Sequence, residues 1–372
     1  MQIKNFSSIL FGDGIGAIFS AIFWVVLASL IPPEQYGELS YLLGIAVFAS
    51  TIAVIGTQET LTVYISKKIK IESTLYLLGL IIGTITSLII LLMFYRLDLV
   101  VMIFAYIIHV LAVGEILGKK LYQSYAKYAF IQKLLTLVLG LGFFYLFGID
   151  GIIYALALTY ALYAVRIYFG FKNSKINFEL LKPRKGFIAN NYLIVVTAGL
   201  QAQIDKFLIA PLLGFALLGN YALALQLIGI MMIFPSVFFK FILPQDSSGV
   251  SNKKLKIIVI LISILISFLG YILSPIIIPE LFPKYNDVID AVQIMSINVI
   301  IATLTYLYTS KFLGLEKSRY LLIGRILAIV VLVIGMLTLG PTYGIIGLSL
   351  AFVANSLVLL IFLYMVNKIK KL

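Results

Sequence analysis

Long apolar stretches alternate with short polar breaks along the whole chain. Because a membrane-spanning helix needs about 20 consecutive apolar residues, the pattern predicts about twelve spans. The breaks on one side are all short, and the longest break on the other side is Phe171–Phe187, near the middle of the chain. The sequence therefore predicts an all-α polytopic membrane protein. The expected spans are 6–31, 38–65, 74–95, 98–117, 128–148, 150–170, 188–210, 216–243, 256–278, 288–312, 320–339 and 343–366.

The positions of lysine and arginine predict how these spans are oriented. Nearly all basic residues fall at every second break, as at Lys67, Lys119 and Lys253. The intervening breaks hold only Arg96 and Lys284, beside several acidic residues. Cytoplasmic loops of membrane proteins carry an excess of Lys and Arg. We therefore expect a multi-pass protein of the cell (cytoplasmic) membrane with both termini in the cytoplasm.

Composition excludes several classes of function. Hydrophobic residues make up 62% of the chain and charged residues 12%, against roughly 45–50% and 25% in soluble domains. The formal net charge of +13 lies in short loops, where orientation and anionic membrane lipids explain it better than nucleic acid. We expect no nucleic-acid partner. The sequence has no cysteine, no Walker loop and no acid or histidine cluster at metal spacing, so we expect no cofactor, metal or catalytic residue.

The two halves of the chain share a weak internal repeat. Six spans in each half give both halves the same orientation, so the repeat axis is expected along the membrane normal and the substrate in the cleft between halves. We expect an N-terminal six-helix lobe at 1–171, a cytoplasmic linker at 172–187 and a C-terminal six-helix lobe at 188–372, around a central cavity. The matching positions, at one constant offset, are Lys119 and Lys311, Lys127 and Arg319, Tyr128 and Tyr320, and Lys133 and Arg325.

Basic residues inside the predicted spans need a physical reason. A charge at mid-membrane costs about 2.5–3.5 kcal/mol on insertion scales. One explanation is snorkelling, in which a long side chain lifts its charge to the interface. The paired placement of Lys133 and Arg325 in the two halves favours the other explanation, that they face the central cleft. The in-span basic residues are Lys133, Arg166, Lys206, Lys240, Lys311 and Arg325.

Carboxylates and one histidine also lie within spans. Asp13 and Glu59 either pair with Lys133 or Arg325 to hold helices together, or bind a proton or sodium ion during transport. Asp205 either neutralises Lys206 or takes the same ion-coupling role. His109 is either a hydrogen-bonded packing residue or a proton relay. The in-span amides considered for the cavity, which either bridge helices or contact sugar hydroxyls, are Gln201, Asn298 and Asn355.

Three stretches carry a resemblance to a known family. Residues 28–37 read Ala-Ser-Leu-Ile-Pro-Pro-Glu-Gln-Tyr-Gly, Asp205-Lys206 precedes a Leu-Gly-Asn-Tyr turn at 218–221, and residues 340–347 read Gly-Pro-Thr-Tyr-Gly-Ile-Ile-Gly. These resemble motifs of the O-antigen and polysaccharide flippases, a branch of the multidrug/oligosaccharidyl-lipid/polysaccharide exporter superfamily. Ser29 departs from that pattern, because the family often has arginine there.

The resemblance implies a two-lobed bundle of 12 to 14 helices. It implies a substrate oligosaccharide on a polyprenyl (pyro)phosphate, moved from the inner to the outer leaflet. From the two-halved architecture we expect alternating access. We also expect coupling to protons, sodium or the membrane potential, because no favourable gradient of the lipid phosphate is guaranteed. Contact with glycan assembly machinery is a further expectation. The cavity cations that would meet the phosphate or acidic sugars are Lys133, Arg166, Lys206 and Arg325, with Lys240 and Lys311 as further candidates.

Three other functions compete with this one. A multidrug or organic-cation antiporter of the same superfamily would want a net acidic cavity, whereas in-span cations here equal or exceed the acids. A membrane glycan polymerase or ligase would need catalytic groups that the short outer loops do not carry. A major-facilitator-type solute carrier also has six plus six spans, but the motifs above argue against it. We expect a transporter and not an enzyme.

Overall fold

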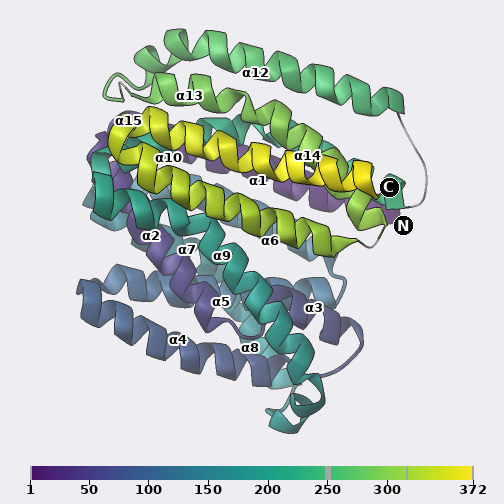
Figure 1. The fold of residues 1–372 in the computed structure, drawn as a ribbon. Coiled ribbons are helices and arrows are strands. Elements are labelled where there is room, and N and C mark those ends of the chain that lie inside the picture. Colours follow the sequence, from purple (N-terminus) through teal and green to yellow (C-terminus); the bar gives the residue numbers. More distant parts are fainter. Residues whose placement is uncertain (1, 248–252, 286, 316, 371–372) are drawn as a thin grey trace. The chain divides into compact units, whose positions relative to one another are not determined.

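The computed structural model describes the backbone of residues 2–247, 253–285, 287–315 and 317–370. Within these ranges it also describes the side chains, except those of residues 2–15, 240, 241, 244–247, 314 and 318. Within these ranges the chain is helical and contains no strand, which confirms the all-α class (Figure 1). The α-helices are α1 (Gln2–Leu30), α2 (Pro33–Ala53), α3 (Gln58–Ser66), α4 (Glu72–Phe94), α5 (Leu97–Gly118), α6 (Tyr122–Phe147), α7 (Asp150–Tyr160), α8 (Ala164–Asn173), α9 (Lys185–Leu213), α10 (Phe215–Met231), α11 (Ile233–Ser247), α12 (Lys253–Leu281), α13 (Val288–Ser296), α14 (Asn298–Gly314) and α15 (Ser318–Ile369).

Several predicted spans are broken helices. The span predicted at 38–65 is divided between α2 and α3, where the Thr57 side chain accepts a hydrogen bond from the Thr60 N–H at 3.2 Å and so begins α3. A side-chain oxygen in this position satisfies a backbone donor that the helix itself leaves free. The helices α10 and α11 meet at a 49° bend. A short 3-10 turn, Ala161–Tyr163, joins α7 to α8.

The helix α15 contains the last two predicted spans. Gly344 has φ 57° and ψ −132°, a conformation that glycine adopts at little cost because it has no Cβ. The two halves of α15 fold back on each other: a Cβ added at Gly335 would lie 2.7 Å from the Cβ of Ala351. Leu321 and Leu363, from opposite ends of α15, also share one hydrophobic cluster with Phe312.

The described part of the chain holds nine segments long and apolar enough to cross a membrane, or ten if the bent α10–α11 pair is one span. That count takes α15 as a single segment and does not include Gly16–Leu30 of α1, which is a shorter apolar helix. The protein is therefore a multi-pass membrane protein. Each predicted span lies on one helix, one broken helix or one half of α15.

The helices form two compact units. Unit 1 comprises Met1–Trp24 and Tyr41–Ile204, and unit 2 comprises Val25–Ser40 and Asp205–Leu372. The chain passes from one unit to the other three times, within α1, within α2 and within α9. The lobe boundaries expected from the repeat stay a prediction, because compact packing does not test the repeat.

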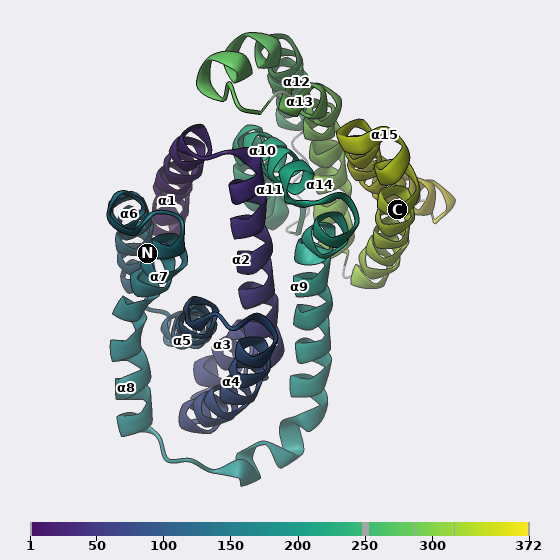
Figure 2. The same cartoon turned by 90° about the vertical axis from the view of Figure 1, so that its left-hand side faces the viewer.

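In unit 1, α5 packs against α3, α4, α7 and α8. Glycines on α5 permit the close approach of α3: a Cβ at Gly114 would lie 2.9 Å from the backbone oxygen of Gln58. The first part of α9 is fixed by polar contacts, since the Asn191 amide donates to Thr60 Oγ1 at 3.0 Å and the Tyr192 hydroxyl donates to the Ile52 oxygen at 2.7 Å. Figure 2 shows the irregular linker that joins α8 to α9.

In unit 2, the turn that joins α1 to α2 is tightly packed. A Cβ on Gly37 would overlap the Phe215 carbonyl oxygen, and one on Gly219 would overlap the Pro33 carbonyl. The Tyr285 hydroxyl donates to the Ile31 oxygen at 3.2 Å, and burial raises the pKa of Tyr285, so it remains a donor. Two of the stretches that carry the family resemblance thus meet at a contact that leaves no room for a side chain.

Candidate functional site

Lys133 lies inside unit 1 beside the only histidine of the chain. Its side chain on α6 is half-buried, and a Cβ at Gly16 of α1 would come within 3.1 Å of Lys133 Cγ. Glycine at position 16 therefore leaves room for the aliphatic part of the lysine. The Lys133 charge acts on the ring of His109, which lies on α5.

Three tyrosines surround His109. The ring centroids of Tyr163 and Tyr160 lie 4.7 and 4.8 Å from that of His109, and the centroid of Tyr106 lies 6.0 Å away. His109 Nδ1 is buried and has no hydrogen-bond partner in the described part of the chain. The sequence analysis did not single out these tyrosines. The sequence does contain an indication of this cluster, because residues three positions apart, such as 106 and 109 or 160 and 163, lie on the same side of a helix.

Arg166 is held by a buried carboxylate. The Glu115 side chain is 1% exposed, and it accepts hydrogen bonds from Arg166 Nε at 2.8 Å and from Lys119 Nζ at 2.5 Å. Removing one partner of a buried ion pair leaves an uncompensated charge and costs about 3–5 kcal/mol. Arg166 therefore has a structural role in unit 1, and its contact with substrate stays a prediction.

Arg325 has a different environment in unit 2. It is exposed on α15 and makes no ion pair with any carboxylate of the described residues. Its charge acts on Tyr306 of α14, whose ring stacks on Phe239 of α11 with centroids 5.0 Å apart. Among the described residues, this cation therefore has a tyrosine within reach of its charge and no acid that forms an ion pair with it.

Asp205 and Lys206 act on each other in α9. The Lys206 backbone N–H donates to Asp205 Oδ1 at 2.8 Å, both side chains are half-buried, and their charges attract. The Asp205 charge also acts on Tyr221 of α10. This arrangement agrees with mutual neutralisation, while a role of Asp205 in ion coupling stays a prediction.

The remaining predicted residues are dispersed. Glu59 is exposed in the first turn of α3, and Lys311 is half-buried in the last turn of α14, where a cation is favourable for the helix dipole. The side chains of Asp13 and Lys240 lie outside the described residues. Among the amides, Gln201 is half-buried, and the buried Oδ1 atoms of Asn298 and Asn355 have no hydrogen-bond partner among the described residues.

The structure thus brings Lys133 to His109, Asp205 to Lys206, and Arg325 to Tyr306. Lys133 belongs to unit 1 and Arg325 to unit 2, so each is described within its own unit. Among the residues that the structure describes, no group of three or more His, Cys, Asp or Glu side chains could hold a metal ion.

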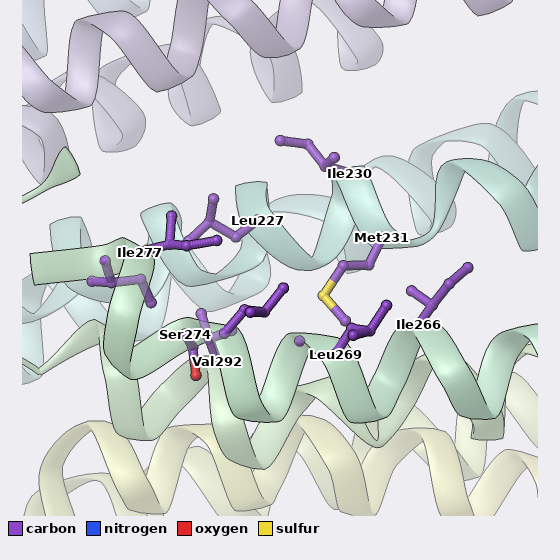
Figure 3. A pocket seen from close by; sticks show the side chains of 11 residues that line it. Leu227, Ile230, Met231, Ile266, Leu269, Ser274, Ile277 and Val292 are labelled. Carbon is purple, nitrogen blue, oxygen red and sulfur yellow. The ribbon is translucent and has the colours of Figure 1, made fainter. Parts of the chain in front are cut away.

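An apolar pocket of about 300 Å³ lies in unit 2 between α10, α12 and α13 (Figure 3). Figure 3 shows the Met231 side chain extending toward Leu269 within it. A Cβ on Gly270 would overlap the end of Met231, so the glycine gives this side chain its space. The Ser274 hydroxyl donates to the Tyr271 oxygen of its own helix at 3.1 Å. The pocket therefore suits a hydrocarbon chain.

No protein-family model matches the sequence, and no curated protein matches it. Solved structures share its fold. The lipid II flippase MurJ in an inward closed conformation has a TM-score of 0.78 at 13% identity, over 97% of this chain and 87% of that chain. An inward-facing multidrug resistance MATE family transporter of the MOP superfamily has a TM-score of 0.60 at 17% identity, over 98% and 96%.

A third solved structure is a MOP superfamily transporter from Pyrococcus furiosus Vc1, described as having a binding pocket of reversed polarity that suggests a different function. Its TM-score is 0.58 at 16% identity, over 96% of this chain and 92% of that chain. At these identities the likeness concerns the fold. The chain thus has the fold of MOP superfamily transporters, as the sequence resemblance implied at the level of the superfamily.

Proposed function

We propose that this protein flips an oligosaccharide linked to a polyprenyl (pyro)phosphate from the inner to the outer leaflet of the cytoplasmic membrane, by alternating access. The fold supports a transporter, since the lipid II flippase MurJ and the MATE transporters share it. The orientation with both termini in the cytoplasm is part of this proposal. It is supported by the basic breaks at every second connection.

One observation carries the choice of an anionic substrate: Arg325 is exposed and forms no ion pair with a described carboxylate. Two of the acids inside the spans offer little counter-charge, because Glu115 is already matched by Lys119 and Arg166, and Asp205 lies against Lys206. A bare cation is costly in a membrane protein and marks a substrate or ion pathway. A phosphate group of the substrate supplies the negative counter-charge that no described residue gives to Arg325.

The physical role of such a cation is to lower the barrier for phosphate. Moving an unpaired charge into a medium of low dielectric constant is strongly unfavourable. A guanidinium offers planar, bidentate hydrogen bonding to phosphate. We assign Arg325 and Lys133 to this contact, with Lys206, Lys240, Lys311 and Arg166 as secondary candidates. The orphan amide oxygens of Asn298 and Asn355 would accept hydrogen bonds from sugar hydroxyls.

The lipid part of the substrate needs an apolar path. The pocket lined by Met231, Leu269 and Ile277 offers hydrocarbon contacts and no unsatisfied polar group. We place part of the polyprenyl chain there. Coupling to protons, sodium or the membrane potential is assigned to Asp13, Glu59, Asp205 and His109. Glycan assembly machinery and anionic membrane lipids are the proposed partners.

The alternative is a multidrug or organic-cation antiporter. Asp205 favours it, because a half-buried carboxylate could exchange Lys206 for a cationic substrate. The MATE transporters that share the fold are multidrug resistance proteins. The two functions differ in the charge of the transported molecule, so one assay on the same preparation separates them.

The test uses protein reconstituted in vesicles with a fluorescent polyprenyl-pyrophosphate oligosaccharide, and measures the fraction of label that a membrane-impermeant quencher reaches. We expect wild-type protein to flip the lipid and Lys133→Ala with Arg325→Ala to lose this activity. Arg319→Ala is the matched control, because Arg319 is exposed on the same helix. Normal flipping by the double variant would reject the cation assignment. Uptake of an organic cation dye, without flipping, would establish the antiporter.

A further inference from the structure

A basic pocket of about 410 Å³ lies on unit 1, apart from the residues assigned to transport. One wall is the connection from α3 to α4, which contributes Lys70. The other wall is formed by the end of α8, which contributes Lys172 and Asn173, and by the linker after it, which contributes Lys175 and Asn177. Two segments that are about a hundred residues apart in the chain therefore place three lysines around one hollow.

Buried hydrogen bonds build the walls of this pocket. The hydroxyls of Ser73 and Ser174 lie 2.7 Å apart, and the Ser73 N–H donates to Ser174 Oγ at 3.1 Å. The Asn177 N–H donates to Thr74 Oγ1 at 2.9 Å. Ser73 and Thr74 are fully buried. The linker is thus fixed to the start of α4, and a ligand entering the pocket finds its walls already in place, which lowers the entropy cost of binding.

A contact at the far end of the linker adds to this rigidity. The Arg184 guanidinium lies over the ring of Tyr64, 5.5 Å from its centroid, and Phe187 packs edge-on against the same ring at 5.5 Å. Both ends of the linker are therefore anchored on unit 1.

The charge in the pocket is unbalanced. None of Lys70, Lys172 and Lys175 forms an ion pair with a described residue, and no carboxylate lines the hollow. Two acids lie close by in the sequence and neither lines the pocket: Glu179 binds Lys182 at 2.8 Å, and Glu72 is buried. Three exposed lysines around one hollow without a lining carboxylate favour an anionic ligand.

We propose that this basic pocket binds a phosphate group, carried either by an anionic phospholipid headgroup or by a soluble phosphate compound. Lysine ammonium groups bind phosphate as point charges, and the amides of Asn173 and Asn177 can donate further hydrogen bonds. The volume falls in the roughly 300–1,000 Å³ range of small-molecule sites. Basic pockets at the ends of membrane helices recognise anionic headgroups. The bound group would clamp the linker onto α4. This inference does not depend on the transported substrate.

The experiment measures binding by the full-length protein in nanodiscs. One arm compares phosphatidylglycerol with phosphatidylcholine as the added lipid, and the other titrates inorganic pyrophosphate in phosphatidylcholine nanodiscs, both read by thermal unfolding. The test variant is K70Q with K172Q and K175Q. The control variant, K67Q with K68Q and K185Q, removes equal charge from exposed lysines of the same unit that do not line the pocket.

We expect the pocket variant to bind at least about tenfold more weakly than wild type, and the control variant to bind within about twofold of it. Stabilisation by phosphatidylglycerol alone would assign a lipid headgroup, and stabilisation by pyrophosphate alone would assign a soluble ligand. Equal losses in both variants would overturn the site, since net charge alone would then explain binding. Absence of any pocket-dependent binding would also overturn it. The variant K70R with K172R and K175R keeps the charge and should restore binding, which separates loss of the site from misfolding.

Discussion

Arg166 in unit 1 and Arg325 in unit 2 are both arginines within predicted spans, yet the structure gives them opposite surroundings. Arg166 donates to Glu115, a fully enclosed carboxylate that Lys119 also contacts. Arg325 is exposed, its charge acts on Tyr306, and it forms no ion pair with a carboxylate among the described residues. An in-span cation is therefore not by itself a substrate contact. What distinguishes the two is whether a neighbouring helix supplies an acid.

The largest expected effect is on stability, through the acid that Arg166 and Lys119 share. Glu115→Ala leaves both cations without their counter-charge, and we expect it to lower the free energy of unfolding by about 3–5 kcal/mol. Chemical denaturation in detergent measures this. Glu59→Ala is the control, because Glu59 is exposed and should change stability by less than about 0.5 kcal/mol. Equal stability of the two variants would show that the Glu115 cluster does not hold unit 1 together.

The second prediction concerns Arg325. Arg325→Ala should leave the free energy of unfolding within about 0.5 kcal/mol of wild type, because the side chain is exposed and forms no ion pair with a described residue. A lost hydrogen bond to a charged group is worth about 1.5–3 kcal/mol, so flipping should fall by about tenfold to a hundredfold. The quencher assay measures the rate, with Arg319→Ala as control. A large loss of stability without loss of flipping would show that Arg325 has a structural role, as Arg166 does, and does not contact the substrate.

A conservative substitution sharpens the same comparison. Arg166→Lys keeps the charge but loses the Nε donor that contacts Glu115, so we expect a loss of about 1–2 kcal/mol in stability. Arg325→Lys should not affect stability and should reduce flipping less than Arg325→Ala does. Thermal unfolding and the quencher assay on the two lysine variants give both results. If Arg166→Lys is as stable as wild type, the guanidinium geometry is unimportant there.

The smallest expected effect is at Asn355. Its buried Oδ1 has no hydrogen-bond partner among the described residues, and an unsatisfied buried acceptor costs about 1–3 kcal/mol. Asn355→Leu should therefore keep or raise stability by up to about 1 kcal/mol, while flipping falls if the amide contacts a sugar hydroxyl. Denaturation midpoints and flipping rates, with Asn298→Leu alongside, separate a packing residue from a binding residue. A clear destabilisation would show that the amide is satisfied in the folded protein.

The sequence by itself determined the membrane class, the approximate positions of the helices and the break within the last one. Each of these depends on local properties: the length of an apolar run, the run of charges at its ends, and the freedom of Gly344 to take a positive φ. The division between α2 and α3 was not predicted, although the cap at Thr57 that begins α3 is itself a local feature. The start of α2 at Pro33, earlier than the predicted 38, is a difference of the same local kind.

Only the tertiary structure decided which charges are paired. Arg166 lies 51 residues after Glu115 in the chain, and Lys172 about a hundred residues after Lys70. Whether such residues meet depends on how each helix is rotated about its axis and which helix it packs against, and a hydropathy pattern does not contain that information. For the same reason the tyrosines around His109 and the serine pair beneath the basic pocket came from the structure. Local periodicity specifies helices, whereas the chemistry between helices is specified by their packing.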